Sequence, residues 1–438
     1  MLRLRARLVL TRTLSALPVA LITGELSSQF PEDGGFTLWV NEAFGPFWAF
    51  QEGYWSLVAG MTNNAMYMIM IVEIVQRAGT GHLQPAVRWT LGAAFAVGAS
   101  APNFLGVRMV GWSLLGAVVV VLAPYALMLP LAAPYVDVAQ WQAGPVSVAP
   151  QRKLTGGHGS LSGWSLLMST AFWNFGGFDS ASTFAGEVHN PARTYPVALV
   201  ASLVLITAGL VLPLLACTLA AASLQGAPPF AEWEDGTYVE LGEALGGPVL
   251  KAMVVVSGFA SQVAMFTTEM VVDSHLLLGM AQQRLAPKAW IMRDPGTGAP
   301  VVCIAVMLFV VLCGFTLLDR NSLLVMNNTF AGASVLLELA AAVKLRGAGA
   351  SRTQQQQQQH HHHHHHHHKE RFKAPCRSRF SLSLSLLPSI GISAYVVMPA
   401  IVASGARVAF NTGLLAITGV LLYAPFSAAE ASSRKSLV

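Results

Sequence analysis

Charged residues are scarce in this chain. Of its 438 residues, 11% are Asp, Glu, Lys or Arg and 54% are hydrophobic. Soluble domains carry about 25% charged residues, so the composition excludes an ordinary soluble core. Cysteines are also few, they form no CxxC pair, and the first three lie in apolar runs, which indicates buried small residues rather than a disulfide framework or a zinc site. The four cysteines are Cys217, Cys303, Cys313 and Cys376.

Sequence signatures of catalysis are absent as well. The chain has no GxSxG, no HExxH, no GxxxxGK[ST] phosphate loop and no Cys/His zinc spacing outside a histidine tract. We therefore expect no enzyme, no catalytic residues, no cofactor and no coupling to ATP within this chain. The net charge of +5 does not indicate nucleic acid binding, because much of the basic excess lies in short loops and at the termini.

Long apolar segments, separated by short polar breaks, make up most of the chain. A helix that spans a bilayer needs about 20 mostly apolar residues. The sequence therefore predicts an all-α polytopic membrane protein. The eleven predicted spans are 14–29, 47–75, 87–106, 109–132, 161–186, 195–222, 249–279, 300–318, 322–345, 382–404 and 408–426.

Basic residues in the loops predict the orientation. The turn 188–195, the loops 280–299 and 346–381 and the C-terminal tail share one side and carry the heavier Lys/Arg load, so we assign this side to the cytoplasm. Four arginines before the first span would then lie on the wrong side. We expect a first helix to be missing from the chain; failure of the rule is the alternative. The arginines are Arg3, Arg5, Arg7 and Arg12.

The predicted organisation has five parts. A basic segment, 1–13, precedes a transmembrane core, 14–345. A cytoplasmic loop, 346–381, separates this core from the last two spans within 382–426, and a cytoplasmic tail covers 427–438. The loop contains a glutamine run, 354–359, followed by a histidine run, 360–368. This tract either binds metal or is a disordered insertion with incidental metal affinity; we favour the insertion and assign no metal site.

The span 161–186 is the most informative, because it is interrupted at its middle by Asn174, Gly176, Gly177 and Asp179. Each glycine weakens a helix by about 1 kcal/mol relative to alanine, and an ionisable group at the bilayer centre costs at least ~2.5 kcal/mol. Membrane helices tolerate such breaks where the backbone lines a protein-enclosed cavity, as in the substrate sites of many secondary transporters. This span therefore predicts a substrate site.

The two half-helices carry opposite partial charges where they meet at the break. Carbonyls at the end of the first attract an ammonium group, and N–H groups at the start of the second attract a carboxylate. Asp179 lies where the second half-helix begins. It either caps the exposed amides or is a titrating carboxylate that pairs with a substrate ammonium, and both roles can hold together.

Three blocks of the sequence, 16–54, 172–199 and 261–287, resemble a known family. The middle block contains FWNFGGFDSASTFAGEVHNPARTYP. Together they are similar to amino acid–polyamine–organocation transporters, nearest to the plant and algal polyamine-uptake group related to the L-type amino acid transporters. The resemblance implies twelve helices with two inverted five-helix repeats around a central site. It also implies that this chain lacks the family's first helix.

The resemblance also implies which residues meet substrate. Trp173 matches an aromatic lid in an arginine/agmatine exchanger, although a packing role is equally open. Family members carry Asp where this chain has Asn63 and Glu where it has Asn327, so the two amides weaken the case for a polyamine and strengthen the case for an amino acid substrate. The expected substrate-binding residues are Asn63, Asn64, Trp173, Asn174, Gly176, Gly177, Phe178, Asp179, Gln262, Phe266 and Asn327.

Two further acids lie one helical turn apart, Glu269 and Asp273. Like charges at this spacing repel, so we expect one to be protonated or both to face a cation. With Asp179 they are candidates for proton or cation coupling. The alternative is an acidic patch at the interface or a hydrogen bond between helices.

A GEVxNP turn follows the broken span. Its candidate residues are Glu187, Asn190, Pro191 and Arg193, and we expect Glu187 to organise the turn or to pair with Arg193.

The sequence thus predicts a secondary transporter for polyamines or amino acids, with proton coupling as a weaker hypothesis. Its partners are a small-molecule substrate, protons and the lipid bilayer, and nucleic acid is not among them. The alternatives are a neutral or cationic amino acid exchanger and, from another class, a transport-inactive sensor or truncated paralogue. We expect the plasma membrane, with an endomembrane or the chloroplast envelope as alternatives.

Overall fold

The computed structural model describes residues 2–76, 83–136, 172–174, 176–221, 223–228, 233, 236–317, 320–359, 390 and 412–424. Across these residues every regular element is a helix, and the one strand-like pairing is an isolated bridge between Asp33 and Phe184. The predicted all-α polytopic class is confirmed.

Most of the predicted spans overlap a described helix, because each span is a long apolar run whose length favours a helix in a bilayer. Helix α1 (Leu2–Gln29) begins before the predicted start at residue 14. Several spans are only partly described, since 161–171, most of 382–404 and both ends of 408–426 lie outside the described residues. The α-helices are α1 (Leu2–Gln29), α2 (Phe36–Phe44), α3 (Pro46–Val75), α4 (Pro85–Phe104), α5 (Val107–Ala132), α8 (Pro191–Ala220), α9 (Thr237–Gln282), α10 (Val301–Leu317), α11 (Arg320–Gln359) and the segment Thr412–Ala424.

Short 3₁₀ helices occupy several connections. They are η2 (Ala133–Tyr135), η3 (Ser180–Thr183), η4 (Ala185–Glu187) and η6 (Lys288–Ile291). Five of the described helical segments are long and apolar enough to cross a membrane. They are Pro46–Val75, Val107–Tyr135, Pro191–Ala220, Thr237–Gln282 and Leu323–Arg346.

Three further features differ from the prediction. The short helix α2 was not predicted; its apolar side chains Phe36, Trp39 and Val40 are buried against neighbouring helices. Helix α9 begins before its predicted span, because two helices join across non-helical glycines at 246 and 247. Helix α11 continues past residue 345 and ends at Gln359, inside the segment predicted as a loop. The histidine run lies outside the described residues.

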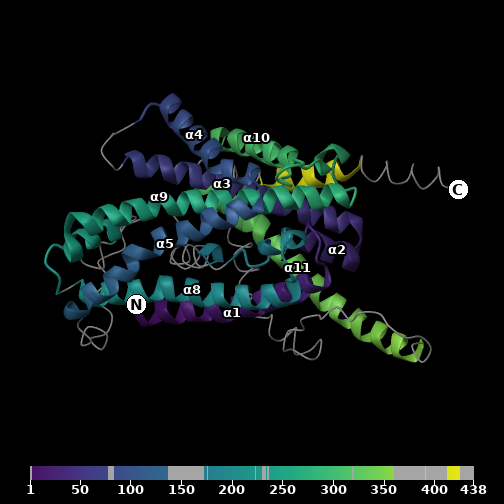
Figure 1. Ribbon diagram of the computed structural model, residues 1–438, viewed down its shortest axis with the longest axis horizontal. Helices are drawn as coiled ribbons and strands as arrows, with labels where there is room; N and C mark the ends of the chain where they lie inside the picture. The colour runs from purple at the N-terminus through teal and green to yellow at the C-terminus, as the bar shows by residue number, and fades with distance from the viewer. Residues whose placement is uncertain are drawn as a thin grey trace.

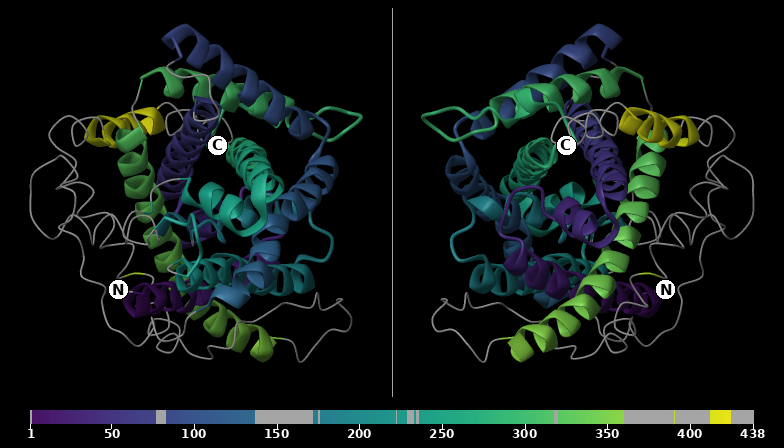
Figure 2. Two further views of the ribbon diagram at one scale, coloured as in Figure 1. Left: turned by 90° about the vertical axis from the view of Figure 1, so that its left-hand side faces the viewer. Right: turned by 90° about the vertical axis from the view of Figure 1, so that its right-hand side faces the viewer.

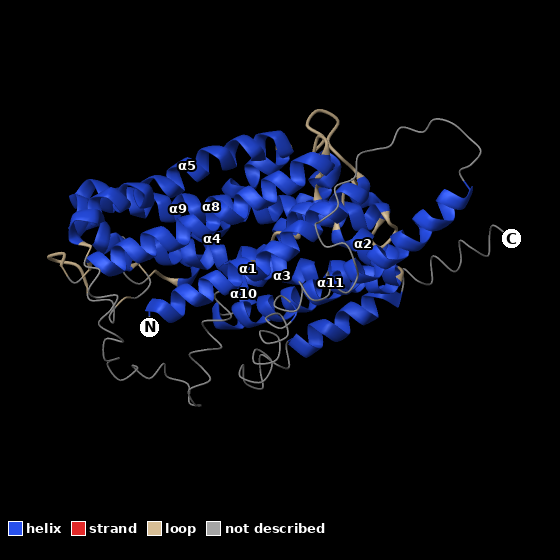
Figure 3. Cartoon of the chain, turned by 90° about the horizontal axis from the view of Figure 1, so that it is seen from below, coloured by secondary structure: helices blue, strands red, loops and turns tan. Residues whose placement is uncertain are grey.

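The helices pack around α3. Helix α3 runs beside α9, and α1 lies side by side with α8 (Figure 1). Helices α4 and α10 cover another side of α3, and α11 crosses it obliquely (Figure 2). The bundle is elongated when seen from below (Figure 3).

Helix α3 is much more buried than the helices at the periphery. Within their most apolar windows, 67% of α3 is buried inside the protein, against 11% for Val107–Tyr135. The outer helices therefore expose apolar side chains on the outside of the bundle, whereas α3 is largely encased by protein. Polar side chains on α3 consequently face other helices.

Candidate functional site

One face of α3 carries a row of polar groups. Glu52, Ser56, the carbonyl of Ala59 and Asn63 are spaced by four, three and four residues. At 100° per residue, eleven residues complete three turns and about 20°, so Glu52 and Asn63 lie on the same side of the helix. Glu52 is fully buried and Asn63 is half-buried. The row therefore lies inside the protein.

Helix α11 meets this row with polar groups at the matching spacing, Asn327, Ser334 and Glu338. Asn327 Nδ2 donates to the Ala59 carbonyl at 2.9 Å. The Oγ atoms of Ser334 and Ser56 are 2.9 Å apart. Because α3 numbers rise as the contacting α11 numbers fall, the two helices are antiparallel here. We call these groups of both helices the α3–α11 polar row.

One end of the row holds two glutamates. Ser334 Oγ lies within hydrogen-bonding distance of Glu52 Oε1 and is 3.2 Å from Glu338 Oε1. The hydroxyl has one hydrogen, so it can donate to only one of these oxygens at a time. Glu338 is 4% exposed and Glu52 0%. Two acids are therefore buried side by side around one hydroxyl.

Helix α9 and Trp173 close the other end. Asn63 Nδ2 donates to Glu269 Oε1 at 3.2 Å, and Asn63 Oδ1 accepts from Trp173 Nε1 at 3.0 Å. Asn64 Nδ2 donates to Asp273 Oδ2 at 3.4 Å. The amide of Asn63 thus links the broken span to α9.

The broken span itself is interrupted where the sequence predicts. Residues 172–174 are helical, 176 and 177 are not, and Gly177 has a φ of 85°, which favours glycine. Asp179 follows, 8% exposed, at the N-cap position of η3. Its side chain makes no capping hydrogen bond. Its carboxyl instead interacts with that of Glu338, so the broken span lies along the polar row, with Trp173 towards one end and Asp179 towards the other.

Other predicted residues lie elsewhere. Phe178 packs in an apolar cluster with Ala16, Ala20 and Tyr195. Phe266 is fully buried and meets Phe95 of α4, with ring centroids 5.3 Å apart. Both aromatic side chains thus serve packing between helices in this structure.

The remaining predicted positions are less enclosed. Asn174, Gly176 and Gly177 are exposed, and Gln262, one turn before Phe266 on α9, is half-buried.

Two acids of the row, Glu52 and Glu338, were missed by sequence reasoning. The signal that could have found them is the shared periodicity. Positions 52, 56 and 63 repeat the spacing of 338, 334 and 327, so each set occupies one helical face. Among the described residues, no group of three or more His, Cys, Asp or Glu side chains is arranged to hold a metal ion.

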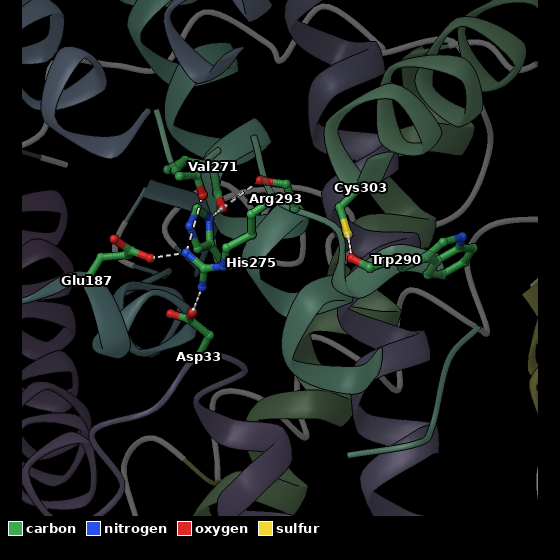
Figure 4. Close-up of polar contacts among 9 residues, drawn as sticks. Asp33, Glu187, Val271, His275, Trp290, Arg293 and Cys303 are labelled. Atoms are coloured by element: carbon green, nitrogen blue, oxygen red, sulfur yellow. Dashed lines mark hydrogen bonds and ion pairs between the residues drawn. The ribbon is translucent and has the colours of Figure 1, made fainter. Parts of the chain in front are cut away.

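A second polar centre joins three connections at one end of the bundle. Arg293, from the α9–α10 connection, pairs with Asp33 before α2 and with Glu187 after the broken span (Figure 4). Backbone contacts reinforce it, since Gly34 N donates to Thr183 O at 2.7 Å. We call Asp33, Glu187 and Arg293 the Arg293 ion-pair network.

Burial and the neighbouring charges shift the pKa values of the residues in this network. Removal from water raises the pKa of Asp33 above its ordinary value, although interactions with His275 and with the positive charge of Arg293 oppose the shift. Burial alone would lower the pKa of Arg293, but the hydrogen bond to Glu187 and the charge of Asp33 raise it. Arg293 therefore stays protonated between its two acids.

The expected pairing of Glu187 with Arg193 is wrong, since Glu187 pairs with Arg293. The reason is local geometry. Asn190 is left-handed, with a φ of 50°, and begins α8. Pro191 takes the first helical position, where its missing N–H costs nothing. Arg193 thus belongs to the first turn of α8, beyond this reversal of the chain.

His275 lies beside the network. Its Nδ1 is 2.8 Å from the carbonyl oxygen of Val271, and its ring meets Phe184 edge to face. Cys303 Sγ donates to the Trp290 carbonyl at 3.2 Å on the neighbouring α10 side (Figure 4). The ring contact ties α9 to the connection at Phe184, and the cysteine contact ties α10 to η6.

Comparison with known proteins gives consistent matches. The sequence profile of a family described as amino acid permease matches residues 8–404. A probable polyamine transporter of Arabidopsis thaliana is 32% identical over 339 residues, covering 76% of this chain and 65% of the relative. The polyamine transporter PUT1 of Oryza sativa subsp. japonica is 34% identical over 286 residues, covering 64% and 49%.

The polyamine transporter RMV1 of Arabidopsis thaliana is 32% identical over 283 residues, covering 64% of this chain and 54% of the relative. The chain therefore spans between 49% and 65% of the length of these three relatives.

Proposed function

The chain belongs to the amino acid permease family, and from this premise we propose that it is a secondary transporter that moves polyamines across a membrane by alternating access. The observation that carries the proposal is the set of carboxylates along the α3–α11 polar row. None of the ion pairs among the described residues involves them. They are Glu52, Asp179, Glu269, Asp273 and Glu338.

A buried carboxylate without a counter-charge is costly, and acids inside membrane segments mark cation and proton pathways. A polyamine carries several ammonium groups and no carboxylate, so its charge complements such an interior. An amino acid would bring its own carboxylate towards these acids. The relatives named as polyamine transporters support the same substrate class.

The proposed mechanism uses the parts already described. The broken span, with Asp179 at its second half, contacts substrate, and Trp173 covers it next to Asn63. The Arg293 ion-pair network closes the end of the bundle where the connections 30–35, 184–188 and 284–299 meet. We assign this end to the cytoplasm from its loop charges, and we propose the plasma membrane as the host membrane.

Replacing Asp179 tests this mechanism. We expect Asp179→Asn to abolish pH-dependent polyamine uptake, because an amide can neither exchange a proton nor pair ionically with an ammonium. The measurement is uptake of radiolabelled spermidine between about pH 5 and pH 8. Glu243→Gln is the control, since Glu243 forms an exposed surface pair with Lys251. Unchanged uptake across pH in Asp179→Asn would remove this residue from the mechanism.

A neutral or cationic amino acid exchanger is the second candidate. It is favoured by Asn63 and Asn327, two amides where the family resemblance implies carboxylates. In the structure both amides donate hydrogen bonds within the protein, to Glu269 and to the Ala59 carbonyl. Competition by leucine and arginine, with putrescine and spermidine ineffective, would favour this candidate.

A further inference from the structure

We propose that Glu52, Ser334 and Glu338 form an ammonium-binding subsite at the end of the α3–α11 polar row opposite Asn63. The inference rests on the proposed function and deepens it, because it assigns a second anchoring point to a polyamine substrate. Neither glutamate is expected at a site from the sequence analysis above.

Glu52 supplies the observation that points to a ligand. Its residue is 0% exposed, and one carboxylate oxygen accepts from Ser334. The other oxygen, Oε2, is buried and has no hydrogen-bond partner. A buried carboxylate oxygen without a partner costs about 1–3 kcal/mol or more. An incoming N–H donor would remove this cost.

The surroundings of Glu52 are acidic. Glu338 shares the Ser334 hydroxyl, and Asp179 interacts with Glu338. Arg346, about two helical turns beyond Glu338 on α11, pairs with Glu25. The three acids are not arranged for a metal ion. An ammonium group, with three N–H donors, suits oxygens contributed by α3, α11 and the broken span.

The spacing of the polar groups along α3 sets the length of polyamine that can reach the subsite. Glu52 and Asn63 are eleven residues apart, which is about 16 Å along a helix at 1.5 Å per residue. Asp179 lies towards the Glu338 end, where its carboxyl interacts with that of Glu338. Acidic groups therefore occur at both ends of the row, with Glu52 and Glu338 at one end and Glu269 beside Asn63 at the other. Standard C–C and C–N bond lengths of about 1.5 Å give an extended triamine a reach on the order of 10 Å.

A triamine can thus hold one ammonium among Glu52, Glu338 and Asp179 while the rest of the molecule extends toward Glu269. A diamine is shorter, and the Glu269 end holds it without Glu52. The subsite therefore distinguishes longer polyamines from diamines.

Binding of three probes to the purified, bilayer-reconstituted chain tests the subsite: spermidine, putrescine and butylamine. We expect Glu52→Gln to weaken spermidine binding by about tenfold or more, the value of one charge-assisted hydrogen bond, and putrescine binding by less than about twofold. Glu338→Gln should act in the same way, and it keeps the test valid if Glu52→Gln does not fold. Glu73→Gln, on the same helix but remote from the row, should change neither affinity.

Three results would overturn the inference. Equal weakening of spermidine and putrescine would assign Glu52 a general structural role. Unchanged affinities would show that no ammonium binds there, and a changed pH dependence without a change in chain-length preference would assign Glu52 to a proton. If the unmodified chain binds no polyamine at all, the proposed function fails first, and this outcome is distinct from the other three.

Discussion

At Gly60 the backbone of α3 has no room for a side chain. A methyl group there would collide with the carboxylate of Asp273, which hydrogen bonds to Asn64 one turn further along. The close approach of α9 therefore requires glycine at position 60. Without this contact, alanine would stabilise the helix by about 0.5–1 kcal/mol relative to glycine.

The residue-scale prediction follows from this contact. We expect Gly60→Ala to abolish most polyamine uptake, because Asp273 must move away from Asn64. Gly98→Ala in α4 is the matched control, since nothing lies within 4 Å of its added methyl. Transport rates and melting temperatures of both variants give the comparison. Normal uptake in Gly60→Ala would show that the position of Asp273 is immaterial to transport.

Sequence reasoning found single residues of the site better than their contacts. Asn63, Trp173 and Glu269 were each named, but their common hydrogen-bond chain depends on how α3, α9 and the broken span approach one another. Glu52 was missed because an acid near the start of a predicted span suits the membrane interface. Only the packing of α11 against α3 shows that it is buried.

At the scale of elements, the Arg293 ion-pair network joins three connections. Asp33 is buried, with a side chain 5% exposed, whereas Arg293 is 31% exposed. Its two acids come from segments before α2 and after the broken span, so opening this end of the bundle requires both pairs to break. We therefore expect the network to stabilise one state of the transport cycle.

Removing Arg293 tests this role. We expect Arg293→Ala to destabilise the protein by about 2–3 kcal/mol, because a buried carboxylate loses its partner while the partial exposure of Arg293 reduces the cost. Lys251→Ala, which breaks the exposed Lys251–Glu243 pair, should cost less than about 1 kcal/mol. Thermal unfolding in detergent measures both variants. Equal effects would contradict a special role for the network.

The positions of helices could be predicted where a long apolar run alone determines the helix. The spans 47–75 and 109–132 match α3 and α5 closely, since few residues inside these runs favour another structure. Helix α2 was not predictable, because nine residues are too short for a span and its buried face depends on α3 and α11. The Gly246–Gly247 join of α9 likewise depends on tertiary packing.

At the scale of the whole molecule, apolar side chains cover the outside and polar side chains lie inside, which is the reverse of a soluble protein. The peripheral helices present large exposed apolar side chains, including Val119, Val204 and Phe309. The encased helix α3 instead carries Glu52 and Asn63 towards the interior. This inversion is the pattern of a membrane protein with a polar pathway at its centre.

The most direct test of polyamine transport is uptake of radiolabelled spermidine into proteoliposomes that contain the whole chain. We predict saturable uptake that excess putrescine or spermidine blocks and that excess leucine or arginine leaves unchanged, because the interior row is acidic. Protein-free liposomes give the background. Spermidine uptake no greater than this background, or uptake blocked by leucine and not by putrescine, would contradict polyamine transport by this chain.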